Sequence, residues 1–165
     1  MATITSPLTR TTYLIARSAH FRVWCGITTG TENEKMIAAL ARIHVMSVNL
    51  DDVTLPCAVV TWGEGRGAER VGVGGGAFIE TQPVATKFFE NFTATPDDPG
   101  TPVHTHDATV KTIIDDMREL SGASDHISFD ELIYSGHMIW GNDAGDEIIE
   151  TEWTWTGPQW GSQDE

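Results

Sequence analysis

Two histidines and an aspartate, His104, His106 and Asp107, have the types and spacing that come closest to a metal site. On an extended segment, the imidazoles of His104 and His106 would lie on the same side. A closed zinc site needs about four ligands, and no further Cys or His cluster lies near them in the sequence. We therefore predict no metal site and interpret these residues as part of a loop and a helix start.

Two glycine-rich segments, residues 63–68 and 72–77, match the pattern G-x-G-x-x-A. In a dinucleotide site this pattern opens a helix, and the helix N-terminus holds the pyrophosphate. Strand-like residues follow both segments here, so the helix that this chemistry requires is missing. We interpret the glycines as turn residues and predict no cofactor.

Three acidic pairs could supply carboxylates for acid–base chemistry, but each lies in a predicted turn or on a polar helix face. A catalytic carboxylate needs an enclosing cleft that shifts its pKa, so we expect these side chains to be solvated. The sequence contains no G-x-S-x-G elbow and no P-loop. We therefore predict no catalytic residue and a protein that is not an enzyme. The pairs are Asp51–Asp52, Asp97–Asp98 and Asp115–Asp116.

The two cysteines, Cys25 and Cys57, are far apart in the chain and flanked by apolar residues. Because free cysteine packs like a small hydrophobe, we predict two buried thiols and a reducing compartment. Trp153, Trp155 and Trp160 follow strand spacing, which is more typical of a core or an interface than of a ligand platform.

The chain has 165 residues, enough for one domain with its own core, and a net charge of −14. This acidity disfavours binding to nucleic acid or to anionic membranes, but it does not exclude a surface past which DNA slides. No apolar run reaches the roughly 18 residues that span a bilayer, and the N-terminus lacks the pattern of a signal peptide. We expect a single soluble intracellular domain over residues 1–165.

A helix over residues 107–122 is the element on which the others depend. At about 100° per residue, its apolar side chains fall within an arc of roughly 120°, and polar residues fill the rest. Asp107 is suited to cap its N-terminus, and Gly122 to end it. One apolar stripe needs one apolar surface, and the other apolar runs predict strands, so this surface is a sheet. The stripe consists of Val110, Ile113, Ile114, Met117 and Leu120.

Two further helices are predicted before the first strand. One covers about residues 7–20, after a flexible arm of residues 1–5. The other begins at a capping box formed by Thr31 and Glu34 and ends near residue 42. The fold class is therefore α+β, with a mixed, mainly antiparallel sheet of about four to six strands and two or three helices packed on it.

The strand pattern also indicates positions within the sheet. The continuous apolar run 55–62 predicts an interior strand covered on both faces, whereas we expect strands 84–92 and 148–155 to be edges. The last two strands should form an antiparallel hairpin, and residues 94–103 and 158–165 a long loop and a flexible tail. The predicted strands are residues 43–48, 55–62, 69–73, 77–82, 84–92, 132–140 and 148–155.

The order of these elements resembles that of the tail terminator (tail-completion) proteins of long-tailed bacteriophages. The resemblance covers residues 31–157 and rests on ARIHV, LPCAVVTWGEG, GGAFIETQ, TVKTIIDDMRELSG, LIYSGHMIW and DEIIETEWTWTG, in this order. It implies a homo-oligomer, a hexameric ring that caps the tail tube, ends its polymerisation and joins the tail to the head connector. The implied partners are the tail tube protein and the connector or head-completion protein, and DNA passes through the lumen without specific binding. The implied location is the virion neck, after assembly in the host cytoplasm.

Three alternatives remain open at this point. The chain could be another neck or head-completion protein, a small-ligand-binding α+β module, or a hydrolase with an unfamiliar site. A ring in the microscope favours the phage interpretations, and a deep pocket in a monomer favours the other two.

Overall fold

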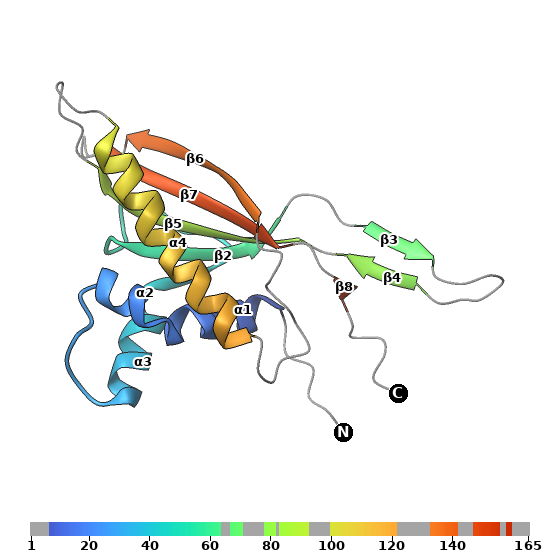
Figure 1. The fold of residues 1–165 in the computed structure, drawn as a ribbon, viewed down its shortest axis with the longest axis horizontal. Helices are drawn as coiled ribbons and strands as arrows, with labels where there is room; N and C mark the ends of the chain where they lie inside the picture. The colour runs from blue at the N-terminus through green and yellow to red at the C-terminus, as the bar shows by residue number, and fades with distance from the viewer. Residues whose placement is uncertain are drawn as a thin grey trace.

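The computed structural model describes residues 7–63, 67–70, 78–81, 83–92, 100–121, 133–141, 147–155 and 158–159. Three helices come first, followed by five strands, one long helix and three strands (Figure 1). The helices are α1 (Pro7–Arg17), α2 (Ala19–Trp24), α3 (Glu32–Leu40) and α4 (Thr101–Ser121). The strands are β1 (Ile43–Val45), β2 (Cys57–Trp62), β3 (Gly67–Arg70), β4 (Phe78–Thr81), β5 (Val84–Phe92), β6 (Ile133–Gly141), β7 (Glu147–Trp155) and β8 (Pro158–Gln159).

Five of these strands form one mixed sheet in the order β1-β2-β5-β7-β6. β1 runs parallel to β2, and each of the other neighbouring pairs is antiparallel. The predicted α+β class with a mainly antiparallel sheet is confirmed, as is the hairpin of the last two long strands. The described helices number four rather than two or three.

The additional helix arises because Ser18 divides the predicted N-terminal helix into α1 and α2. The backbone of Ser18 is extended, with φ −63° and ψ 122°, and its Oγ accepts a hydrogen bond from the Phe21 N–H. A serine in this position satisfies an amide of the first turn that would otherwise lack a partner. The capping box of α3 is present as predicted, with reciprocal hydrogen bonds between Thr31 and Glu34.

Helix α4 carries the predicted apolar stripe but begins earlier than predicted. It starts at Thr101, so Asp107 is not its N-cap, and residues 101–103 are helical rather than part of a loop. Proline is tolerated in a first helical turn, where its missing N–H is not needed. Pro102 therefore does not prevent the helix from forming there. The side chains of Val110, Ile113, Ile114 and Met117 are buried against the sheet, and Leu120 is partly buried beside them.

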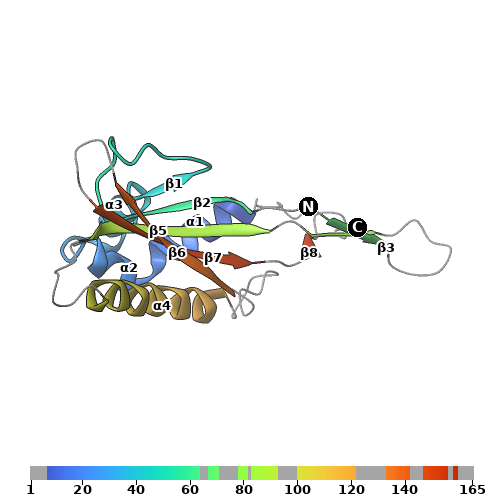
Figure 2. The ribbon, with the colours of Figure 1, turned by 90° about the horizontal axis from the view of Figure 1, so that it is seen from above.

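The main core lies between the helices and one face of the sheet. All four helices contribute to it, and Ala58, Val60, Val84 and Phe88 contribute from the strands. Figure 2 shows α2 and α4 side by side along this face. We call it the helix-bearing face.

The opposite face of the sheet holds a second, smaller core. Residues 46–56 pass over it, and the apolar side chains of this segment pack on Cys57, Val59, Phe89 and Ile148. Strand β2 is therefore covered on both faces, as its continuous apolar run predicted.

The prediction that residues 84–92 and 148–155 form edge strands is wrong. β5 is the middle strand of the sheet, and β7 lies between β5 and β6. The edges of the described sheet are β1 and β6, and β6 borders the sheet in Figure 1. The alternation within residues 84–92 suggested an edge strand, but Phe89 packs in the second core and Lys87 forms an ion pair with Glu150 of β7.

A second sheet has three strands in the order β3-β4-β8. β3 and β4, which overlap the predicted strands 69–73 and 77–82, pair antiparallel, and in Figure 1 they lie beyond one end of the large sheet. Pro158 and Gln159 pair with Thr81 and Glu80, so this part of the predicted flexible tail is a strand instead. The arm 1–5, most of the loop 94–103, the remaining tail and the Gly122 cap lie outside the described residues.

Candidate functional site

The two histidines considered as metal ligands do not face the same side. Both lie in α4, where a spacing of two residues turns the side chain by about 200°. His106 is fully buried, whereas His104 is exposed. The extended segment that would bring the two imidazoles together is therefore absent, and the residues interpreted as a loop and a helix start lie within α4. Among the residues that the structure describes, no group of three or more His, Cys, Asp and Glu could hold a metal ion.

His106 belongs to a polar chain that links α4 to β5 and α2. Its Nδ1 lies 2.6 Å from Glu90 Oε1, and Glu90 Oε2 accepts a hydrogen bond from Trp24 Nε1 at 3.0 Å. The Trp24 and His106 rings lie 6.0 Å apart. The second ring nitrogen of His106, Nε2, is buried without a hydrogen-bond partner among the described residues. These contacts tie two helices to the middle strand, and the His106 imidazole is buried away from solvent.

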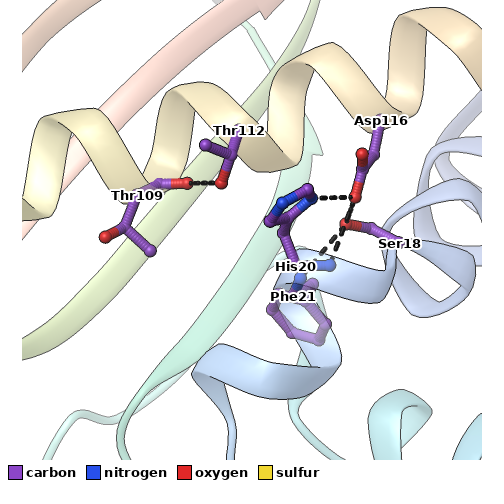
Figure 3. Close-up of polar contacts among 6 residues, drawn as sticks. All are labelled: Ser18, His20, Phe21, Thr109, Thr112 and Asp116. Atoms are coloured by element: carbon purple, nitrogen blue, oxygen red, sulfur yellow. Dashed lines mark hydrogen bonds and ion pairs between the residues drawn. The ribbon is translucent and has the colours of Figure 1, made fainter.

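A second polar cluster joins the start of α2 to α4 (Figure 3). Asp116 Oδ2 accepts hydrogen bonds from Ser18 Oγ at 2.7 Å, from the His20 N–H at 3.2 Å and from His20 Nδ1 at 2.8 Å. Burial alone would raise the pKa of the Asp116 carboxyl, but the bonds from Ser18 and His20 outweigh it and lower this pKa below its usual value of 3.8. Asp116 is therefore not the solvated charge that its sequence position predicted.

The cluster of Ser18, His20 and Asp116 contains the residue types of a serine hydrolase, but not the geometry. In a catalytic triad the imidazole lies between the hydroxyl and the carboxylate, so that it can take the hydroxyl proton. Here Ser18 and His20 bind the same carboxylate oxygen, and Ser18 is fully buried. Its Oγ also accepts the Phe21 N–H. This arrangement caps α2 and fixes it on α4.

An open groove of about 710 Å³ runs between α2 and α4. Its apolar lining residues are Ala19, Val23, Trp24 and Ala108. Polar groups lie at its rim, including Thr112, whose Oγ1 donates to the Thr109 carbonyl at 2.6 Å (Figure 3). The rim histidines are His20 and His104. The groove has the size of a small-molecule pocket.

Both cysteines are buried free thiols, as predicted. Burial raises the pKa of Cys25 to about 11 and that of Cys57 to about 12. A thiol reacts as its thiolate, so neither cysteine is a nucleophile near neutral pH.

The two edges of the large sheet are surfaces that the sequence reasoning placed elsewhere. On β6, Met138 and Ile139 are 51% and 47% exposed. At the other edge, Val45 of β1 is 47% exposed and Met46 follows it with 53%. Long apolar edges favour pairing with another chain. Hydrophobic runs alone could not identify these edges, because an edge is defined by which strands pair.

The remaining chemical candidates have structural surroundings. Asp51 and Asp52 are exposed in a turn, where Asn49 accepts the Asp51 N–H and donates to the Asp52 carboxylate. The first glycine-rich segment runs into β3, which begins at Gly67, so a strand follows it and not the helix that a dinucleotide site requires. Trp153 packs in the core and lies edge-on to Tyr134. Asp97–Asp98, the segment 72–77 and Trp160 lie outside the described residues.

The sequence matches no protein-family model and no curated protein. The resemblance to phage tail terminators therefore rests on the order of elements alone. None of the described helices is long and apolar enough to cross a membrane.

Proposed function

We propose that this chain is a structural assembly protein of the tail-terminator kind. It closes into the six-fold ring that the resemblance implies, caps a tail tube and joins it to the head connector. The observation that supports this role is β6, a nine-residue strand at the sheet edge with exposed apolar side chains and no charged residue.

Strand β6 lacks the devices that keep an edge strand monomeric. Natural edges carry charged side chains or proline, or they are very short. The sequence of β6 is IYSGHMIWG, and a register shift between Tyr134 and Gly136 is its one irregularity. Met138 and Ile139 face opposite sides of the sheet, so a neighbouring strand would cover apolar area on both faces.

The polar clusters of the described chain support a structural role. Asp116 and Ser18 cap a helix, Glu90 and His106 tie helices to the sheet, and Arg22 links three helices through its bonds to Ala16 and Glu32. In each cluster the polar groups bond to other helices or strands of the same chain. The net charge of −14 per chain suits a ring lumen through which DNA passes without binding.

The proposal is tested by assembly in the phage that carries this chain. Depleting the protein during growth should give tails that are overlong or lack heads when imaged by electron microscopy. Tails of normal length that still join heads would rule the terminator role out. In vitro, the mass of the purified protein should correspond to a closed ring, either alone or on added tail tubes.

An edge variant and a matched control make the test specific. Ile139→Asp places a charge on the β6 edge and should abolish the ring. Ile37→Asp changes an exposed isoleucine on α3, rather than on a sheet edge, and should leave the ring intact. If both variants assemble like the wild type, the β6 edge is not the contact.

The groove between α2 and α4 favours a second function, a small-ligand-binding module. Its lining is largely apolar, and its volume lies in the range of ligand pockets. Under this alternative, apolar small molecules should raise the melting temperature, and Ala108→Trp, which fills the groove, should remove that shift. A monomer that shows no shift with any compound would leave this alternative without support.

A further inference from the structure

We propose that the two edges of the large sheet pair with each other between copies of this chain. β6 of one copy lies antiparallel to β1 of the next copy, so the sheet continues from subunit to subunit, head to tail. This inference rests on one part of the proposed function, the self-assembly of the chain. It goes further by naming the two surfaces that meet in the assembly.

Strand directions within one copy make this pairing antiparallel. β1 and β2 run in the same direction, and each of the three steps from β2 through β5 and β7 to β6 reverses the direction. β1 and β6 therefore run in opposite directions. When a second copy stands beside the first in the same orientation, its β1 meets the β6 of the first in an antiparallel register, the arrangement with the better hydrogen-bond geometry.

The exposed apolar side chains match across such a junction. Val45 pairs with Val60, which belongs to the core under the helices, so Val45 lies on the helix-bearing face. Ile139 pairs with Ile149, which shares its face with Thr151, whose Oγ1 donates to Asp107 of α4. Val45 and Ile139 thus lie on the same face at opposite edges. In a head-to-tail sheet, the register that sets Val45 opposite Ile139 makes them an apolar cross-strand pair, which contributes stability.

Charge also directs copies to these edges. The chain holds 24 acidic and 10 basic residues, so two copies repel each other over most of their surface. β6 has no charged residue, and β1 consists of Ile43, His44 and Val45. Burial lowers the pKa of His44, which keeps its imidazole neutral near pH 7. The two edges are neutral strips on an acidic protein.

The length of the strands sets the strength of the contact. β6 has nine residues but β1 only three, and β1 ends at Met46, whose φ of 78° turns the chain out of the strand. A single junction is therefore short and weak. In a closed ring every copy has two junctions, and a tail tube that holds the copies together raises their effective concentration. This explains how a weak contact can close only on its template.

Pairing of β6 with a second β6 is the competing arrangement. It would use one edge twice about a two-fold axis, stop at a dimer, and leave Val45 and Met46 uncovered. Head-to-tail pairing covers both edges and permits a ring.

Cysteine cross-linking in the full-length protein distinguishes these arrangements. Val45→Cys and Ile139→Cys are made singly and together, and each protein is treated with a short bismaleimide, alone and on tail tubes. The wild type provides the background, because Cys25 and Cys57 are buried thiols of raised pKa. Val23→Cys combined with Ile139→Cys is the matched control, since Val23 is exposed but lies on α2, away from both edges.

Head-to-tail pairing predicts that neither single variant is cross-linked alone. A mixture of the two single variants should give covalent dimers and nothing larger, and the double variant a ladder up to the full ring. The Val23→Cys control should stay monomeric.

Three results would overturn the inference. Dimers from Ile139→Cys alone would show two-fold pairing of β6 and leave self-assembly intact. A wild-type ring without cross-links in any combination would exclude edge pairing but not the proposed function. A wild-type protein that stays monomeric even on tail tubes would contradict both the edge pairing and the proposed function.

Discussion

Replacing Asp116 by alanine is the perturbation whose consequence follows most directly from the structure. One carboxylate oxygen accepts three hydrogen bonds, two of them from side chains and one from the backbone of His20. All three come from the start of α2, so the carboxylate fixes this short helix on α4. Its removal leaves the hydroxyl of Ser18, which is fully buried, without its acceptor.

The expected loss of stability is about 2–3 kcal/mol. A hydrogen bond to a charged group contributes roughly 1.5–3 kcal/mol, and a buried polar group left without a partner costs about 1–3 kcal/mol. The His20 ring is largely exposed, so its bond contributes little, and the loss of the Ser18 bond dominates. For a chain of this size, such a loss lowers the melting temperature by roughly 4–12 °C.

Asp115→Ala is the matched control because it removes the neighbouring carboxylate. The Asp115 side chain is 58% exposed and bonds to Arg118 one turn away at 3.3 Å, whereas the Asp116 side chain is 20% exposed. An exposed pair of this kind contributes less than about 1 kcal/mol. Asp116→Asn retains an acceptor for Ser18 and should fall between alanine and the wild type.

The pH dependence gives an independent check on the same carboxylate. The folded-state pKa of Asp116 lies below its usual value of 3.8, so its charged form stabilises the fold above that value. This stabilisation is lost as the pH falls through the folded-state pKa. The stability difference between the wild type and Asp116→Asn should therefore be constant near neutral pH and shrink below about pH 4. Equal melting temperatures for Asp116→Ala and Asp115→Ala at pH 7 would refute the reasoning.

Three further predictions concern the core, the histidines and the end of β1. Ile113→Asp places an unpaired charge in the core under α4 and should cost at least about 3 kcal/mol by denaturant unfolding; unchanged solubility and melting temperature would contradict the assigned stripe. EDTA should leave the melting curve unchanged, because His104 and His106 point to different sides of α4, and a stoichiometric metal by mass spectrometry with unfolding in EDTA would contradict this. Met46→Gly should keep or raise stability by up to about 1 kcal/mol, since Met46 has φ 78°, while Val45→Gly should lower it by about 1 kcal/mol; the opposite order would contradict the backbone assignment.

The parts of the fold that sequence predicted correctly depend on neighbours along the chain. The stripe of α4, the capping box at Thr31 and the apolar run of β2 each have a spacing that a local period detects. The break at Ser18 was missed because it depends on Asp116, which lies 98 residues away and holds the serine in its capping position. The start of α4 was missed because prolines were taken as loop residues, although Pro102 fits a first turn.

The positions of β5 and β7 in the sheet were missed because the edge prediction rested on alternation and on large apolar side chains, and neither feature shows which strands pair. Lys87 fits the predicted edge, because charged residues are typical of edge strands. In the structure Lys87 lies in the middle strand, where its Nζ is 3.4 Å from Glu150 and 3.6 Å from Glu152 of the neighbouring β7. These partners allow a charge in the centre of the sheet. The true edge β6 has instead the uncharged, apolar composition of an interior strand. An apolar composition suits β6 only when another strand lies beside it. Assembly with a second copy would place such a strand there.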